Sequence, residues 1–271
     1  MATQNAEVTR HFIAVPQGTL HYAQAGVGEP ILLLHQTPRS WNEFREVLPL
    51  LGERRRAIAM DTIGFGDSSA LPPGGDSIEA WADAALAMLD ALDIEQAHVV
   101  GHHTGATIAT HLAASAPERT RSVVLSSCTF DGAEVRTGRP GGRAIVDDVD
   151  RCADGSHLLE LWQKRAAFYP PDDIDLLERY MIDALKAGPR AAEGHHAVAR
   201  FDLESALSHI RCPVLLIGAT QDPAAYPALA RLRVALPQAE VHEIEGGMVP
   251  LPDQLPDQFA AAVERFLDRI D

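Results

Sequence analysis

Short apolar segments alternate with helical patterns along most of this chain, and this alternation limits the folds that it can adopt. The apolar segments show little of the alternation expected of a half-exposed strand, which is typical of strands buried on both faces. They cover residues 31–35, 57–60, 98–101, 123–126 and 214–217. Helical periodicity covers residues 77–92, with Ser77 as the expected N-cap, and residues 104–114. Strands that alternate with helices predict a parallel sheet with helices on both faces.

An antiparallel edge is expected at the start of this sheet. Residues 12–15 and 20–25 form two short runs, and the turn residues Pro16-Gln17-Gly18 separate them. Such a pair is typical of a β-hairpin.

One predicted strand ends in Gly101-His102-His103-Thr104-Gly105, where two glycines bracket a sharp turn into a helix. This spacing is that of a nucleophile elbow, in which a strained turn holds one side chain above the sheet. In this chain the side chain at the top of the turn belongs to His103. A neutral imidazole can act as a base, a nucleophile or a hydrogen-bond donor.

Composition excludes several classes of partner. The net charge of -15 argues against nucleic acid and against an anionic membrane surface, because both would be repelled. Cys128, Cys152 and Cys212 are odd in number and widely separated, so they indicate neither a disulfide framework nor a metal site. No signal peptide or membrane span is evident. We therefore expect a cytoplasmic protein, monomeric or homodimeric, that acts on a small molecule.

The alternation of strands and helices is interrupted after Phe130. About eighty residues of helical pattern follow before the next strand, and they begin with Gly138, Pro140, Gly141 and Gly142. We predict an α/β core formed by residues 1–130 and 209–271. A helical cap over residues 131–208 is expected to cover the carboxyl edge of its sheet.

Four motifs carry a resemblance over nearly the whole chain. They are His35-Gln36-Thr37-Pro38 after the third strand, the loop at residues 61–68, the elbow, and the loop at residues 218–223. Together they resemble the α/β-hydrolase superfamily of the helical-cap type. The resemblance implies the α/β-hydrolase fold, a mostly parallel sheet of about eight strands flanked by helices. Fold alone does not fix the reaction.

Two positions depart from the superfamily pattern. His103 stands where the resemblance implies Ser, Asp or Cys, and Gly247 stands where it implies the base histidine. Of the usual triad only Asp222 remains. A Ser-His-Asp relay, in which the histidine removes the proton of the hydroxyl, cannot be assembled from these positions.

The candidate catalytic residues follow from these motifs. His103 is the candidate base or nucleophile, and Asp222 is its candidate orienting partner. The backbone N–H groups of Thr104 and Gln36 are the oxyanion donors that the resemblance implies. Asp131 is the alternative acid, because some members of the superfamily carry theirs after the sixth strand.

Further residues are candidates for lining the substrate site, although each is also compatible with a purely structural role. They are His35, Trp41, Asp131, Trp162 and His196. A metal site formed by His35, His102, His103 and Asp222 is not expected. Neighbouring residues of a strand point to opposite faces, and no ligand spacing of the H-x-H or HExxH kind is present. No cofactor is expected either, because no GxGxxG or Walker motif follows a strand.

Three functions remain open. The first is cofactor-independent hydrolysis of a small apolar ester, lactone or related carbonyl compound, with His103 as base or nucleophile. The second is a lyase, isomerase or C–C-cleaving reaction that uses His103 as a general base. The third is a non-catalytic ligand-binding protein, for which the loss of the base at Gly247 is the argument.

Overall fold

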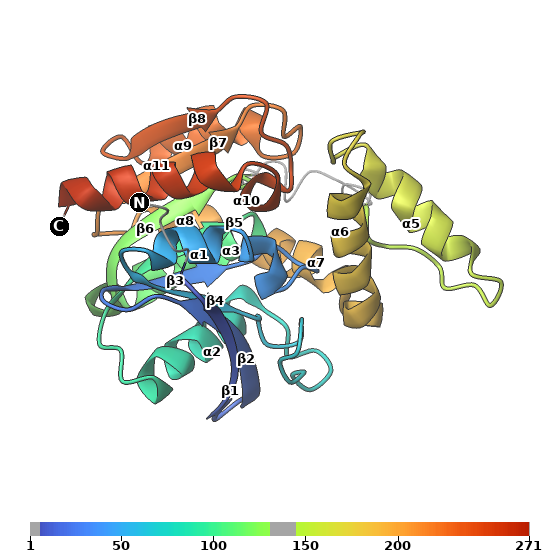
Figure 1. The fold of residues 1–271 in the computed structure, drawn as a ribbon, viewed down its shortest axis with the longest axis horizontal. Coiled ribbons are helices and arrows are strands. Elements are labelled where there is room, and N and C mark those ends of the chain that lie inside the picture. Colours follow the sequence, from blue (N-terminus) through green and yellow to red (C-terminus); the bar gives the residue numbers. More distant parts are fainter. Residues whose placement is uncertain (1–5, 131–144, 271) are drawn as a thin grey trace.

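The computed structural model describes residues 6–130 and 145–270, and an eight-stranded sheet runs through its centre (Figure 1). The strands lie in the order β1-β2-β4-β3-β5-β6-β7-β8. The pairs β1–β2 and β2–β4 are antiparallel, and all other neighbours are parallel. The strands are β1 Val8–Val15, β2 Gly18–Ala25, β3 Pro30–Leu34, β4 Arg56–Met60, β5 Ala97–His102, β6 Thr120–Ser126, β7 Val214–Ala219 and β8 Glu240–Ile244. The predicted fold, including the antiparallel hairpin at the edge, is confirmed.

Strand β3 illustrates why the central strands are continuously apolar. Leu32 and Leu34 pack into one apolar cluster, whereas Ile31 and Leu33 pack into a second cluster on the other face of the sheet. Successive side chains of a strand point to opposite faces, so a strand covered on both sides needs an apolar residue at every position.

Helices cover both faces of the sheet. Apolar residues of α2, α3, α8 and α9 contribute to the cluster on one face, and those of α1 and α11 contribute to the cluster on the other. Ser77 caps α2 as predicted, because its side chain accepts a hydrogen bond from the N–H of Ala80. The helices of the core are α1 Val47–Gly52, α2 Ile78–Ala91, α3 Thr104–Ser115, α8 Leu203–Leu207, α9 Leu229–Ala235, α10 Leu251–Gln254 and α11 Pro256–Ile270.

The described residues of the predicted cap, 145–208, contain three further helices besides α8. They are α5 Ser156–Ala166, α6 Ile174–Ala187 and α7 Glu193–Arg200. Figure 1 shows α5 projecting away from the sheet, with α6 between it and the core. Helices α5 and α6 share an apolar cluster of their own, which includes Leu161 and Tyr180, whereas Ala197 of α7 packs into the core cluster. Only part of the predicted cap is therefore built around a separate apolar cluster.

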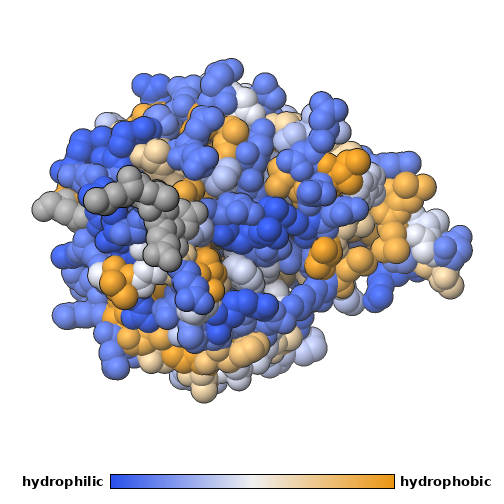
Figure 2. Space-filling view, viewed as in Figure 1, coloured by the Kyte–Doolittle hydropathy of each residue, from blue (hydrophilic) through white to orange (hydrophobic). Residues whose placement is uncertain are grey.

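Buried ion pairs fasten α6 to the core. Arg39 is fully buried, and its guanidinium donates to Asp183 of α6 at 2.8 Å and to Asp253 of α10 at 2.7 Å. An unpaired buried charge is costly, so these pairs favour one position of α6 relative to the core. Figure 2 shows hydrophobic residues gathered on the protruding cap. Exposed residues there include Leu159 of α5 and Ile182 of α6.

None of the helices in residues 6–130 and 145–270 is both long enough and apolar enough to cross a membrane.

Candidate active site

The turn between β5 and α3 holds His103 in a strained backbone conformation, with φ of 48° and ψ of -113°. A Cβ added to Gly101 would lie 2.2 Å from the carbonyl oxygen of Gly105. A Cβ added to Gly105 would lie 1.9 Å from the carbonyl oxygen of Leu34. Only glycine fits at both positions, because a real Cβ cannot approach a backbone oxygen so closely. The turn therefore has the geometry of a nucleophile elbow with an imidazole at its top.

The structure brings His103 and Asp222 together. Nε2 of His103 lies 2.7 Å from Oδ2 of Asp222, and Oδ1 of Asp222 accepts hydrogen bonds from the N–H groups of Ala224 and Ala225. Burial favours the protonated carboxyl of Asp222. The His103 imidazole and the two N–H groups outweigh burial and lower the pKa of Asp222 to about 2. Asp222 is therefore an anion at neutral pH.

The hydrogen bond to Asp222 determines which nitrogen of His103 is reactive. A carboxylate only accepts hydrogen bonds, so Nε2 of His103 carries the proton and Nδ1 keeps a lone pair. Nδ1 has no hydrogen-bond partner among the residues that the structure describes. The side chain of His103 is 12% exposed, whereas that of Asp222 is fully buried. In a neutral ring paired in this way, the lone pair that is free of hydrogen bonds to the described residues is therefore that of Nδ1.

His102 has a structural position beside this pair. Its Nε2 donates to the carbonyl of Val249 at 2.8 Å, and its Nδ1 lies 2.9 Å from Oγ of Ser126. Burial, reinforced by the neighbouring His103, lowers the pKa of His102 to about 3, so the ring is neutral. The two rings meet edge to face at 4.8 Å between centroids. Neighbouring side chains of a strand diverge unless a turn redirects one of them, and the contact between these rings agrees with such a redirection at the strained elbow.

The backbone N–H of Gln36, the expected oxyanion donor, already donates to another residue of the protein. This N–H donates to Oε2 of Glu43 at 2.8 Å, and the side-chain amide of Gln36 donates to Oε1 at 2.5 Å. Burial raises the pKa of Glu43 to about 8 against the opposing effect of Arg39. The N–H of Gln36 is therefore not free to bind a substrate oxygen, which corrects the assignment made from the sequence.

Thr37, the residue after Gln36, lies beside Thr104. Its hydroxyl lies 2.9 Å from the hydroxyl of Thr104, the residue after His103. In the part of the chain that the structure describes, the backbone N–H groups of Thr37 and Thr104 have no hydrogen-bond acceptor. Thr37 was not among the candidates predicted from the sequence, although it lies within the motif at residues 35–38.

Two of the candidate lining residues face other parts of the protein. His35 is fully buried, and both ring nitrogens are engaged: Nδ1 donates to the carbonyl of Gln36, and Nε2 accepts from the N–H of Thr62. The ring of Trp41 lies under the guanidinium of Arg10 at 5.3 Å and contacts His21. His35 is thus a structural residue, and Trp41 packs toward β1 and β2.

No contact among the described residues places Trp162 or His196 beside His103. Trp162 packs against the apolar cluster of α5 and α6. His196 is exposed on α7, and its neighbour His195 is the residue that binds a carboxylate, at 2.9 Å from Asp147. The expectation that Trp162 and His196 line the site is therefore not supported by their contacts. Asp131 lies outside the described residues.

Gly247 lies beside the loop of Asp222, because its carbonyl accepts a hydrogen bond from the N–H of Gln221 at 2.8 Å. A Cβ added at Gly247 would lie 2.7 Å from a methyl group of Leu251. The carboxylate of Asp222 thus meets an imidazole from the elbow and none from this loop.

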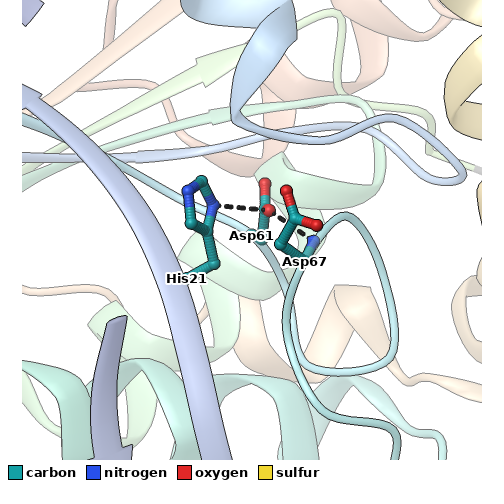
Figure 3. Close-up of side chains that lie close together, drawn as sticks. All are labelled: His21, Asp61 and Asp67. Atoms are coloured by element: carbon teal, nitrogen blue, oxygen red, sulfur yellow. Dashed lines mark hydrogen bonds and ion pairs between the residues drawn. The ribbon is translucent and has the colours of Figure 1, made fainter. Parts of the chain in front are cut away.

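A second cluster of ionisable residues is formed by His21 of β2 and by Asp61 and Asp67, which follow β4. Figure 3 shows His21 pointing at Asp61, with Asp67 beside it. Their ligand atoms lie within 4.8 Å of one another, which is close enough to hold a cation. Each already has a protein donor: His21 donates to Asp61 at 2.8 Å, and Asp67 is paired with Arg10 and Lys186. The cluster is therefore a hydrogen-bonded, charge-balanced network.

Comparison with known proteins identifies the family to which this fold belongs. A family model for the alpha/beta hydrolase fold matches residues 29–248. A 2-hydroxymuconate semialdehyde hydrolase of Pseudomonas sp. (strain CF600) is 40% identical over 129 residues, which cover 46% of this chain and 45% of that protein. The putative carbamate hydrolase RutD of Azorhizobium caulinodans is 28% identical over 259 residues, which cover 93% and 96%.

A solved structure of a hydrolase from Pseudomonas aeruginosa PA01 superposes with a TM-score of 0.77 at 24% identity and covers 96% of this chain and 98% of that one. The chain spans between 38% and 64% of the length of the first three curated relatives. Because the family model matches most of the chain, the protein belongs to the α/β-hydrolase family, a family in which its relatives are named as hydrolases.

Proposed function

We propose that this protein is a cofactor-independent hydrolase of a small apolar ester, lactone or related carbonyl compound, in which His103 acts as a general base. The observation that carries the proposal is the hydrogen bond of 2.7 Å between His103 and Asp222 at the top of the elbow. This pair is the base and orienting acid of a hydrolytic triad without the nucleophilic side chain. The relatives named as hydrolases support a hydrolytic reaction.

In the proposed reaction His103 activates a water molecule. Nδ1 accepts a proton from the water as its oxygen attacks the carbonyl carbon, and Asp222 stabilises the resulting imidazolium. Nδ1 adjoins the ring carbon that carries Cβ, so direct attack by this nitrogen is hindered. A base is therefore favoured over a nucleophile.

The negative charge that develops on the carbonyl oxygen needs donors. The unpartnered backbone N–H groups of Thr37 and Thr104 are the proposed oxyanion donors. Collapse of the tetrahedral intermediate then expels the alcohol, and His103 returns the proton to it. No covalent acyl-enzyme forms on this route.

A non-hydrolytic reaction is the second candidate. The elbow carries no serine, aspartate or cysteine, and Gly247 supplies no second imidazole. A single His–Asp pair can also remove a proton from a carbon next to a carbonyl group. Incubation of each tested compound in deuterated water separates the two: exchange or rearrangement without cleavage favours the second candidate.

The test uses a panel of p-nitrophenyl esters and small lactones in ¹⁸O-labelled water. Under single turnover with excess protein, all ¹⁸O is expected in the acid product, and intact-protein mass spectra are expected to show no acyl adduct. A serine-directed organophosphonate is expected to leave the protein unlabelled and active. An acyl adduct, or loss of activity upon labelling of a serine, would show that a nucleophile other than water is used.

A further inference from the structure

Ser127 follows the strand that lies between the strand leading to His103 and the strand leading to Asp222. The sheet order places β6 between β5 and β7. His103 follows β5 and Asp222 follows β7, so the contact between them passes over the end of β6. Ser127 is the first residue after β6, and its N–H donates to the carbonyl of Ile217 in β7 at 2.9 Å. The N–H of His103 donates in turn to the carbonyl of Ser126 at 3.0 Å.

Two features of Ser127 are unfavourable for folding. Its φ of 46° lies in the left-handed region, and among the described residues only Asp93 and His103 are other non-glycine residues with positive φ. Its hydroxyl is buried and has no hydrogen-bond partner within residues 6–130 and 145–270. Strain and an unpaired buried hydroxyl each cost folding free energy, and both are concentrated at functional sites. Glycine would avoid both costs.

We propose that Ser127 is a positioning residue of the His103–Asp222 pair, and that its hydroxyl donates to the Asp222 carboxylate as the pair takes up a proton. This inference rests on the proposed function. Asp222 accepts three hydrogen bonds here, from His103, Ala224 and Ala225, and a carboxylate can accept a fourth.

The burial of Ser127 defines the kind of role it has. The residue is 3% exposed, so its hydroxyl does not reach a substrate and acts only through the pair above it. An added donor fixes the carboxylate while the imidazole above it gains and loses a proton. Ser127 is thus neither the missing nucleophile nor an oxyanion donor.

Two substitutions separate the hydroxyl from the backbone. Ser127→Ala removes the hydroxyl and keeps the strained φ, whereas Ser127→Gly also relieves the strain. Both variants are expected to lower kcat about tenfold with KM unchanged, the size expected for one hydrogen bond to a charged group. Ser127→Ala is expected to melt at the wild-type temperature, and Ser127→Gly at a higher one.

Ser122→Ala is the matched control. Ser122 lies on the same strand, and its hydroxyl is 2.8 Å from Nδ1 of His98, near the opposite edge of the sheet. This variant is expected to lower the melting temperature and to leave kcat unchanged. Wild-type kcat in both Ser127 variants would overturn the proposal, as would covalent labelling of Ser127 by an organophosphonate.

The imidazole ¹⁵N NMR signals of His103 test the same inference without turnover. With the imidazole of His103 protonated at low pH, Ser127→Ala is expected to shift the Nε2 signal, which reports the bond to Asp222, while Ser122→Ala leaves it unchanged. Identical Nε2 signals of protonated His103 in wild type and Ser127→Ala would refute the positioning role. If wild type hydrolyses no carbonyl compound but this shift is observed, the proposed function fails and the positioning role stands.

Discussion

Replacement of Asp222 by asparagine exchanges one carboxylate oxygen for an NH₂ group. It removes the negative charge and one hydrogen-bond acceptor and keeps the other acceptor. The variant keeps an oxygen that can accept from Ala224 and Ala225. It places an amide NH₂ group opposite Nε2 of His103, and this group can only donate. Nε2 must then become an acceptor, which moves the proton of the imidazole to Nδ1. The nitrogen that serves as the base is thereby blocked.

The expected loss of activity is large. A general base contributes about 10²- to 10⁴-fold to the rate, and a wrong tautomer removes this contribution. Asp222→Asn should therefore lower kcat by about 10³-fold while KM changes little. The assay is steady-state turnover of the best ester or lactone from the panel. Activity within tenfold of wild type would refute the assignment of the proton to Nε2.

Asp222→Asn should also lower the stability of the folded protein, by an amount that depends on pH. The pKa of Asp222 is lowered from 3.8 to about 2 in the folded state, which corresponds to about 2 kcal/mol at neutral pH, at about 1.4 kcal/mol per pH unit. For a lowered carboxyl pKa this stabilisation is complete above pH 4 and is lost as the pH falls toward 2. Asp222→Asn should melt roughly 4–8 °C below wild type at pH 7. A difference that does not shrink between pH 5 and pH 3 would contradict this reasoning.

Two further predictions concern the fold. Gly105→Ala should reduce the free energy of unfolding by about 3 kcal/mol or more in urea titrations, because the added Cβ meets the carbonyl oxygen of Leu34; wild-type stability would contradict the tight turn. Tyr180→Phe should reduce the free energy of unfolding by about 1–3 kcal/mol, because the hydroxyl of Tyr180 donates to buried Asp147. The control Tyr169→Phe should leave the free energy of unfolding unchanged, because the hydroxyl of Tyr169 has no hydrogen-bond partner in the described chain. Equal losses of stability in the two variants would refute the contribution of the Tyr180 hydrogen bond.

The sequence predicted the strands that are buried on both faces, because each needs an apolar residue at every position. Residues 240–244 were not among the predicted strands. Strand β8 lies at the edge of the sheet, and Glu240, His242 and Glu243 keep its sequence polar. A half-exposed edge strand leaves no continuous apolar run for sequence reasoning to detect.

Motifs predicted Asp222 as the candidate partner of His103, with Asp131 as the alternative acid, because the turn after β5 and the loop after β7 lie at the same edge of the sheet. They did not predict which nitrogen of His103 is free, since this depends on the rotation of the ring. They also could not show that Glu43, seven residues after Gln36, folds back onto its N–H. Contacts of this kind depend on side-chain packing, for which the spacing of residues contains no signal.

The roles of His103 in catalysis and of Asp222 as its partner stay predictions, as do the boundaries of the cap. His35 and Trp41 lie near the motifs in sequence, but their rings turn toward Thr62 and Arg10. His35 was a candidate because it lies at the end of a strand, and Trp41 because its ring suits an apolar substrate. Neither argument determines the direction in which the folded chain turns the side chain.

The role of His103 as the base is tested most directly by the turnover of one ester or lactone by wild type and by His103→Ala. His209→Ala is the control, because His209 is exposed and precedes β7, near the opposite edge of the sheet. If His103 is the base, His103→Ala lowers kcat at least about 100-fold while the protein stays folded, and His209→Ala retains wild-type activity. Turnover by His103→Ala at the wild-type rate would contradict the role of His103 as the base.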